Sequence, residues 1–518
     1  MAGCRQHADN HATQAPPQTP IPDTAPAGAQ KSGTADMFDP TQNPTASTGV
    51  ALNLESLTAS QKKYGIAPKR DHKVTYAPEV IVMEQGDQAI TAVDDDGMTW
   101  HFDASSPHVS EFQEGKIIMA TGRAVGRIGQ LTRSGGSVTV KLAPVQITEV
   151  IKDGHFIFDG DVDATQMIVY EAPSFPSILD LKAPSSTSMN WEGWADSPFL
   201  KAAVELPSTL GSTQAPNLTS MTPPQASQVM TLSGGAFKTF PIIGSDRSVG
   251  VGFGYHKSGL NMEAWGTLGL TGAHIKFALD IQNFKIVTAG MNLGGASSFR
   301  MKLQVWSDEK ETTINASQLV ELPADIYLPI PIGGVPLGLT FHTSFTFSTA
   351  VSAKRSVMTA DAEYTAEGDI FIGWKDGSPQ ISPFAKTYAK NSLANNLQGV
   401  SVGINSLALG FKVEPMIGIG AFGFNTGVYV GVSFGGSAVR QSDAAMRQCR
   451  AGYMNGVING GVGYQLPAAF VKIINGILSV FTKYQISGSG HLLEVPDHRF
   501  MDLGESIPPG CASQGQKT

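Results

Sequence analysis

Residues 337–351 read LGLTFHTSFTFSTAV, and an apolar or β-branched side chain occupies every second position of this stretch. Leu337, Leu339, Phe341, Phe345 and Phe347 share one side, and the residues between them are small or polar. A repeat of two residues is that of a β-strand, in which successive side chains point to opposite faces. Because an ordinary strand has about 5–6 residues, the stretch predicts an unusually long strand with one apolar face.

The same alternation recurs through the second half of the chain and predicts a large antiparallel sheet. Residues 326–332, which include Pro329 and Pro331, predict an edge or entry strand, since proline cannot donate to a β-ladder. A hairpin over residues 416–434 is expected to turn at Phe424–Gly427. Further alternating runs cover residues 249–255, 275–281, 301–305, 370–374 and 400–404. Hairpins in succession indicate a meander, because parallel strands would need crossover connections.

Two late segments interrupt this pattern and predict helices. One runs from Ser442 to Arg450, and the other runs from Pro467 to Tyr484 behind a proline at a permitted first-turn position. The second helix would be apolar nearly all round. Its bulky positions include Phe470, Ile474, Ile477 and Phe481.

The first third of the chain predicts a tether and a small β module. Residues 1–50 are rich in Pro, Thr, Ala and Ser and poor in large apolar residues, so they predict a disordered tether. Short alternating runs over residues 51–171 predict a small β-barrel or sandwich. The expected organisation is therefore mainly β: this module, an irregular linker over 172–234, a large long-stranded antiparallel domain over 235–511 with one or two late helices, and a tail over 512–518.

The composition restricts the classes of function. Charged residues make up 15% of the chain, against a typical value of about 25%, and the net charge of -8 includes no basic run. A nucleic-acid partner is therefore not expected. No stretch is long and apolar enough to predict a transmembrane helix.

Two segments resemble parts of bacterial envelope proteins. The trio Ala2-Gly3-Cys4 resembles the cleavage end of a lipoprotein signal, in which the cysteine becomes lipidated, although the basic and apolar regions of such a signal are missing. Residues 112–158, from FQEGKIIM to DGHFIF, resemble a β-module of uncharacterised bacterial surface proteins. These resemblances imply a bacterial cell-envelope or extracellular location, with membrane contact through an N-terminal anchor at most. The alternative is that Cys4 is an accidental cysteine near the terminus.

An envelope location would also bear on the remaining cysteines. Cys449 and Cys511 both lie in the last part of the chain. Because thiols are oxidised in that compartment, the lipoprotein hypothesis implies a Cys449–Cys511 disulfide.

Motifs for catalysis are not apparent. The sequence has no nucleophile elbow, P-loop, HExxH, CxxC or dinucleotide-binding fingerprint, so an enzyme is not expected. Asp159, Asp161 and Asp163 have the spacing of a calcium loop, and Ca²⁺ is the one candidate cofactor. Ala164 and Tyr170 depart from that loop, where glycine and a bidentate glutamate belong. The alternative is an acidic turn that ends the first module.

Three functions stay open at the level of the sequence. The first is a non-enzymatic structural or adhesive surface module whose apolar sheet face is simply core. The second is a carrier of a lipid or another apolar ligand, held between the long sheet and the late helix. The third is an outer-membrane β-barrel, since alternating segments of about 9–11 residues would span a bilayer.

Overall fold

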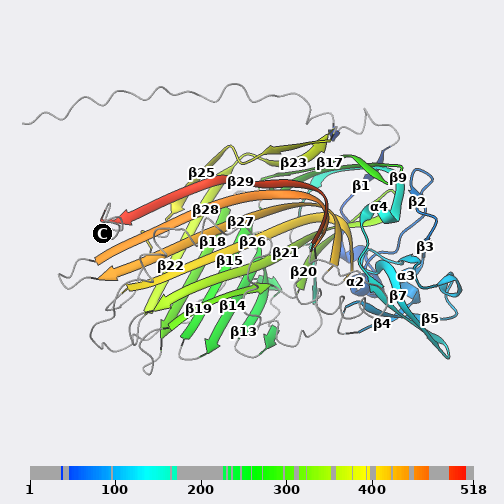
Figure 1. Ribbon diagram of the computed structural model, residues 1–518, viewed down its shortest axis with the longest axis horizontal. Helices are drawn as coiled ribbons and strands as arrows, with labels where there is room; N and C mark the ends of the chain where they lie inside the picture. Colours follow the sequence, from blue (N-terminus) through cyan, green and yellow to red (C-terminus); the bar gives the residue numbers. More distant parts are fainter. Residues whose placement is uncertain are drawn as a thin grey trace, which may run out of the picture.

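The computed structural model describes a protein that is mainly β, as the sequence predicts. The described residues are 37–38, 46–94, 97–163, 166–171, 226–228, 232–234, 237–244, 248–257, 260–270, 272–295, 298–307, 314–321, 324–351, 357–375, 377–392, 394–396, 404–421, 424–442, 448–465 and 489–508. They form an elongated body of two large sheets, with a smaller sheet at one end (Figure 1).

The smaller sheet has six strands in the order β3-β6-β7-β8-β5-β4. Its strands are β3 (Val80–Val82), β4 (Ile90–Val93), β5 (Thr99–Asp103), β6 (Ile117–Met119), β7 (Val125–Ser134) and β8 (Ser137–Ala143). Short helices accompany it: η1 (Leu54–Ser56), α2 (Ala59–Tyr64), α3 (Gly86–Ala89), η2 (Val109–Glu111) and α4 (Ile147–Val150). In β8 the alternation of half-buried and buried residues shows that one face of this sheet packs into the core.

The largest sheet has 15 strands, and its main order is β24-β23-β17-β16-β9-β1-β20-β21-β26-β27-β28-β29. Its strands are β1 (Ser47–Gly49), β2 (Thr75–Tyr76), β9 (Ile151–Asp161), β10 (Ile168–Glu171), β16 (His274–Gln282), β17 (Lys285–Gly294), β19 (Ile314–Glu321), β20 (Ala324–Ile332), β21 (Val335–Val351), β23 (Ile370–Lys375), β24 (Ser378–Ser382), β26 (Ile404–Ala421), β27 (Phe424–Ser442), β28 (Gln448–Gln465) and β29 (Ser489–Ile507). The long strand predicted from residues 337–351 is confirmed as β21, which has 17 residues.

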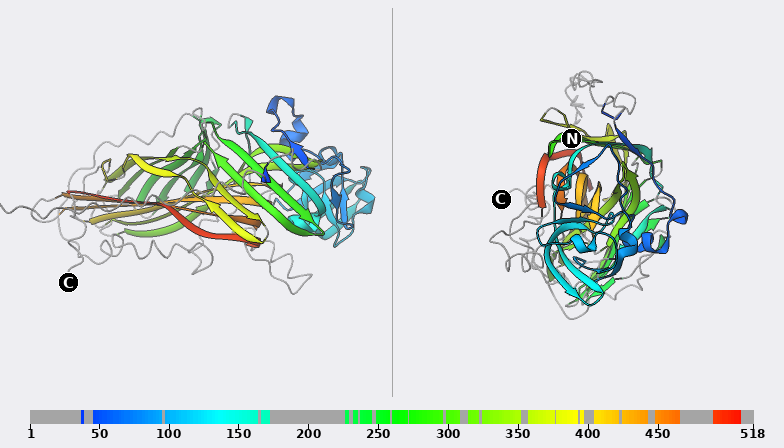
Figure 2. Two further views of the ribbon diagram at one scale, coloured as in Figure 1. Left: turned by 90° about the horizontal axis from the view of Figure 1, so that it is seen from above. Right: turned by 90° about the vertical axis from the view of Figure 1, so that its right-hand side faces the viewer.

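The third sheet has eight strands in the main order β11-β13-β14-β15-β18-β22-β25, with β12 beside β13. They are β11 (Ala226–Gln228), β12 (Leu232–Gly234), β13 (Phe237–Gly244), β14 (Ser248–Lys257), β15 (Leu260–Gly269), β18 (Ser298–Ser307), β22 (Val357–Glu367) and β25 (Lys386–Asn391). Figure 2 shows this sheet beside the long strands of the largest sheet.

The two large sheets are held together by aromatic packing. The ring of Phe299 in β18 stacks on Phe434 in β27 with centroids 4.2 Å apart, and on Phe411 in β26 at 5.3 Å. Gly266 in β15 lies close to Phe411, where an added Cβ would come within 3.0 Å of the ring. Most of the buried apolar side chains form one continuous cluster, with members from Tyr64 in the small module to Met501 in β29.

Strand β9 joins the small module to the largest sheet. Its first residues pair with β2, and the rest pairs with β16 on one side and with β1 on the other. The module is therefore continuous with the sheet through backbone hydrogen bonds, and the expected boundary near residue 171 does not separate two independent sheets.

A two-residue turn joins β20 to β21 and fixes which residues of the two strands pair. Gly333 and Gly334 have φ of 57° and 74°, and they connect the paired residues Ile332 and Val335. Two consecutive positive φ values are typical of a type I′ turn, which matches the twist of the strands and which glycine adopts without strain.

The prediction that residues 326–332 form an edge strand is wrong. β20 pairs with β21 on one side, and on the other it pairs with β10 over Ala324–Tyr327 and with β1 at Ile332. Pro329 and Pro331 lie between these two contacts, where neither β10 nor β1 forms a ladder pair with them. The prolines are tolerated because their missing N–H groups face a gap in the pairing.

Four other predictions need correction. Ser442 and Gln448–Arg450 belong to β27 and β28, so the ends of the predicted helix over 442–450 are strand. Ala421 pairs with Phe424, so the hairpin between β26 and β27 turns before the predicted Phe424–Gly427. The meander is incomplete, because β15 pairs with β18 and β17 with β23, which are not the next strands along the chain, although both ladders are antiparallel as expected. Finally, the expected tether and linker contain strands β1, β11 and β12.

The predicted helix over 467–484 lies outside the described residues.

We expect Gly338→Ala to destabilise the fold. The ring of Tyr327 lies over Gly338, and an added Cβ would stand 1.8 Å from Tyr327 Cε2. Because an overpacked core forces neighbours to move, the loss in free energy of unfolding should be about 1–3 kcal/mol, measured by chemical denaturation. Gly136→Ala is the control, since an added Cβ there meets nothing within 4 Å. Equal stability of the two variants would contradict this packing.

Candidate functional site

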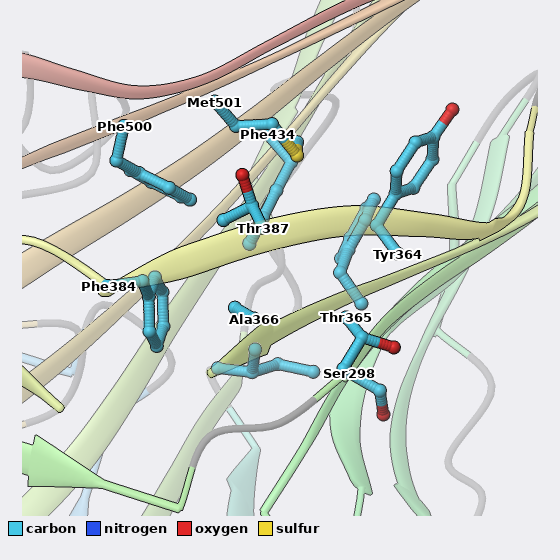
Figure 3. A pocket seen from close by; sticks show the side chains of 11 residues that line it. Ser298, Tyr364, Thr365, Ala366, Phe384, Thr387, Phe434, Phe500 and Met501 are labelled. Carbon is cyan, nitrogen blue, oxygen red and sulfur yellow. The ribbon is translucent and has the colours of Figure 1, made fainter. Parts of the chain in front are cut away.

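An aromatic cluster lies where the edge of the eight-stranded sheet meets the edge of the largest sheet. We call this cluster the aromatic seam. It consists of Phe299, Tyr364, Phe384, Phe434, Phe500 and Met501. Figure 3 shows Tyr364, Phe384, Phe434, Phe500 and Met501 around a pocket that Ser298, Thr365, Ala366 and Thr387 also line. Phe299 lines the same pocket.

Phe500 contacts two other rings of the seam edge to face, whereas Phe299 stacks on Phe434. Phe500 lies 5.8 Å from Phe434 at 90° between ring planes, and 5.3 Å from Phe384 at 64°. Such edge-to-face pairs add about 0.5–1.5 kcal/mol each beyond the burial of area. Phe434 and Met501 are almost fully buried, whereas Phe500 is half-buried. The seam is therefore an apolar opening that its own side chains nearly fill.

The free space in this pocket is small. Its cavity volume, measured for the centre of a water-sized sphere, is about 10 Å³. That volume is about what one water molecule requires, so a larger ligand would enter only if the strands at the seam moved apart.

A carboxylate ties the two sheets together beside the seam. Glu505 in β29 accepts a hydrogen bond from Asn395 Nδ2 at 3.2 Å, and it also contacts the Ser392 hydroxyl just after β25. Most of the residues in β25 are exposed. Glu505 therefore links β29 to the residues that follow β25.

The predicted calcium residues occupy a strand and the residues after it. Asp159 and Asp161 lie in β9, so their side chains are on the same face of the sheet. His274 in β16 lies between them: its Nε2 is 2.6 Å from Asp159 Oδ1, and its Nδ1 is 2.8 Å from Asp161 Oδ1. Lys276 Nζ is 3.5 Å from the other oxygen of Asp159.

This arrangement does not fit the calcium prediction. A calcium loop turns carboxylates inward around one point, whereas a strand sets alternate residues about 6.6 Å apart along one face. Within the described part of the chain, no group of three or more His, Cys, Asp or Glu side chains is arranged to hold a metal ion. Asp159 and Asp161 instead bind a histidine.

The two carboxylates change the titration of His274. Hydrogen bonding to Asp161 raises the pKa of the imidazole, burial opposes this, and Asp159 raises the pKa further. The charged form is favoured because both ring N–H groups then donate to carboxylates. The cluster is an ion pair that links β9 to β16.

A second polar group lies on the long strands. Tyr429 in β27 is almost fully buried, and its pKa is raised, first by burial and then by the carboxylates of Glu414, Glu494 and Asp497. Asp497 also accepts a hydrogen bond from Asn459 Nδ2 at 2.8 Å. Since its hydroxyl stays neutral at ordinary pH, Tyr429 is not suited to act as a nucleophile.

The other predicted residues divide between the core and the undescribed segments. Leu337, Leu339 and Phe341 are buried in the main cluster, as expected for the apolar face. Phe345 and Phe347 belong to β21, and Cys449 belongs to β28. Cys4, Cys511, Phe470, Ile474, Ile477 and Phe481 lie outside the described residues, so the lipidation, the disulfide and the apolar late helix stay predictions.

Sequence reasoning missed the seam. Phe299, Phe434 and Phe500 lie on strands that are far apart in the sequence. Period two places Phe299 and Phe434 on apolar faces of their strands, whereas Phe500 lies at an irregularity in the register of β29, between the paired residues Arg499 and Met501. Nothing in the local pattern indicates that the three faces meet.

Comparisons with known proteins give families without an assigned function. The model of a domain of unknown function, DUF8402, matches residues 218–493, which is more than half of the chain. The model of a second such domain, DUF8403, matches residues 60–153, which contain the six-stranded sheet. No curated protein and no solved structure matches the chain. Among the described residues, none of the helices has the length and hydropathy needed to cross a membrane.

We predict that His274 titrates above its ordinary value. A pKa raised in the folded state means that the ion pair stabilises the fold below the unfolded pKa near 6.5, and that this contribution is lost as the pH rises through the folded pKa. An NMR titration of the imidazole should show this increase, and Asp161→Asn should reverse most of it. His108, which lies beside Glu111 in the small module, serves as an internal reference that Asp161→Asn should leave unchanged. An unaltered His274 titration in Asp161→Asn would contradict the assignment.

Proposed function

The chain belongs to the DUF8402 family, and we propose that it is a non-enzymatic structural or adhesive module displayed on the bacterial cell envelope or outside the cell. The observation that supports this proposal is the continuous core. One buried cluster joins the small module and both large sheets, and β9 pairs with β2 and β16, so residues on both sides of the expected module boundary share the largest sheet. A body built in this way resists local unfolding, because no part can open without exposing apolar surface that another part covers.

The position of β1 supports the same function. β1 follows the N-terminal segment and lies between β9 and β20 in the largest sheet. A force applied through an N-terminal tether would therefore act along a strand that is paired on both sides. Such a connection suits a module held at a surface, and the proposed lipidation of Cys4 and the Cys449–Cys511 disulfide are compatible with it.

We expect the small module and the long strands to unfold together. Phe156 in β9 and Phe102 in β5 are both fully buried in the common cluster, and Phe→Ala at such sites costs about 3–5 kcal/mol. The variants Phe156→Ala and Phe102→Ala should each lower the denaturant concentration at which amide protection from hydrogen exchange is half lost. The decrease should be the same in β7–β8 and in β26–β28. Leu492→Ala, at an exposed position, should leave both midpoints unchanged.

Two results would contradict the proposal. One is a Phe102→Ala variant that loses protection only in the small module. The other is saturable turnover of a substrate by the purified wild-type chain. Surface display is tested separately, because protease added to intact cells should cleave the chain only if it is outside.

The aromatic seam favours a second function, the binding of an apolar ligand such as a fatty acid. The seam is lined almost entirely by aromatic and small side chains, and it lies at a junction that Glu505 closes. Apolar ligand sites are lined mainly by hydrophobic and aromatic residues with a few polar groups. Separation of β25 from β29 would give such a ligand access to the rings.

A fluorescent fatty acid tests this second function. We expect saturable binding to the wild-type chain and binding weakened by about tenfold or more in Ala366→Phe, because one ring fills the pocket and a loss of about 1.4 kcal/mol is tenfold. Asp361→Phe adds the same ring at an exposed position of the same strand, so its binding should match the wild type. Failure of the wild-type chain to bind, or equal loss in both variants, would exclude the seam as the site.

A further inference from the structure

The largest sheet contains a slot that only a short strand fills. Within the described residues, no ladder joins β9 directly to β20; β1 lies between them, parallel to β9 and antiparallel to β20. Without β1, the facing edges of β9 and β20 would present unpaired N–H and C=O groups. Such edges are a template for an added strand.

The slot is shaped for the sequence of β1. A Cβ at Gly49 would meet Ile332 Cγ1 at 2.3 Å and the carbonyl oxygen of Pro331 at 2.9 Å, so only glycine fits there. Ser47 is buried against Gly333, where an added Cβ would come within 2.4 Å of Ser47 Cβ. Lys73 Nζ donates to the carbonyl oxygen of Ala46 at 3.2 Å.

A hollow on the neighbouring strands holds a second part of the same segment. Ala278, Gly290 and Gly373 form one cross-strand row over β16, β17 and β23. Met37 and Phe38 are buried there, with Phe38 edge-on to Phe371 at 6.0 Å between centroids. A Cβ at Gly290 would come within 2.6 Å of Met37 Sδ, so the small residues make room for these two side chains.

We call Met37, Phe38 and residues 46–50 the N-terminal arm; residues 39–45, which connect its two parts, lie outside the described residues. Its described partners in the sheet belong to β9, β16, β17, β20 and β23, which are far from it in the sequence. Val50, at the end of the arm, is 73% exposed, whereas Leu52 N already donates to Pro329 O. Val50 is therefore the position at which the arm can change direction without removing a buried side chain, while Ala51 keeps its packing and Leu52 keeps its hydrogen bond.

We propose that the slot and the hollow together form an acceptor site for the N-terminal arm of a second copy of this chain. An acceptable partner must present glycine at the position of Gly49, and an apolar pair at the spacing of Met37-Phe38. A second copy meets both requirements because it carries the same arm. Exchange of identical arms preserves every contact described above, so the cost is confined to the connection near Val50. The proposal does not depend on the structural function, since it rests only on the fit of the arm.

Cysteine cross-linking between copies tests the proposal directly. Thr48 and Ile157 are paired across β1 and β9, and neighbouring strands lie at a Cα separation that a disulfide can bridge. In a background with Cys4, Cys449 and Cys511 changed to Ser, one full-length chain carries Thr48→Cys and the other Ile157→Cys. The two are co-expressed and oxidised mildly. A linked dimer forms at this pair only if the arm of one copy occupies the slot of the other.

Matched variants make each result decisive. We expect at least about tenfold more linked dimer than with Asp361→Cys as the second chain, because a seated arm raises the effective concentration of the thiol. Adding Gly49→Val to the arm should remove the linked dimer. A single chain with both Thr48→Cys and Ile157→Cys reports that the arm seats at all. Arm exchange is overturned if the chain with both cysteines forms an internal bridge while the mixture of the two single variants forms no linked dimer. It is also overturned if the chain with both cysteines forms no bridge, or if the mixture gives no more linked dimer than the Asp361→Cys control.

Discussion

The structure depends on the pairing of β9, because this one strand forms main-chain hydrogen bonds both with β2, near the small module, and with β16 in the large domain. Its start pairs with β2 beside the small module, and its remaining residues pair with β16 and β1. Phe156 and Phe158 of β9 are buried in the common core. Since an unpaired buried backbone group costs as much as a lost hydrogen bond, the order of the largest sheet follows from satisfying both edges of β9.

The high glycine content has a physical role in this packing. Aromatic rings lie over glycines at Tyr327 and Gly338, at Phe500 and Gly456, and at Phe411 and Gly266, where an added Cβ would approach each ring to 3.0 Å or less. A ring beside a glycine occupies the space that a side chain would take, and at Gly266 this lets the two large sheets approach closely. The 57 glycines are therefore partly a requirement of the core.

The sequence predicted the local structure better than the pairing. The alternation of apolar with small or polar residues identified β21, β14 and β16, because this pattern depends only on neighbours in the chain. The slot for β1 and the interior position of β20 were missed because they depend on partners more than a hundred residues away. Asp159 and Asp161 were singled out by their spacing as calcium ligands, but their partner His274 lies on another strand and no local spacing indicates it.

The two proposed binding regions share one cause. In a core filled to this extent, ligands and partners gain most where the pairing of strands is least complete, because a new contact there displaces only a few existing ones. The seam lies between the outer strands β25 and β29, which Glu505 connects from its side chain, and the arm slot lies between β9 and β20, which β1 joins through only a few backbone pairs. Both are junctions closed by short elements. Binding is therefore expected where the pairing within or between these sheets is incomplete, because a small change in pairing there opens a surface that the rest of the fold holds in place.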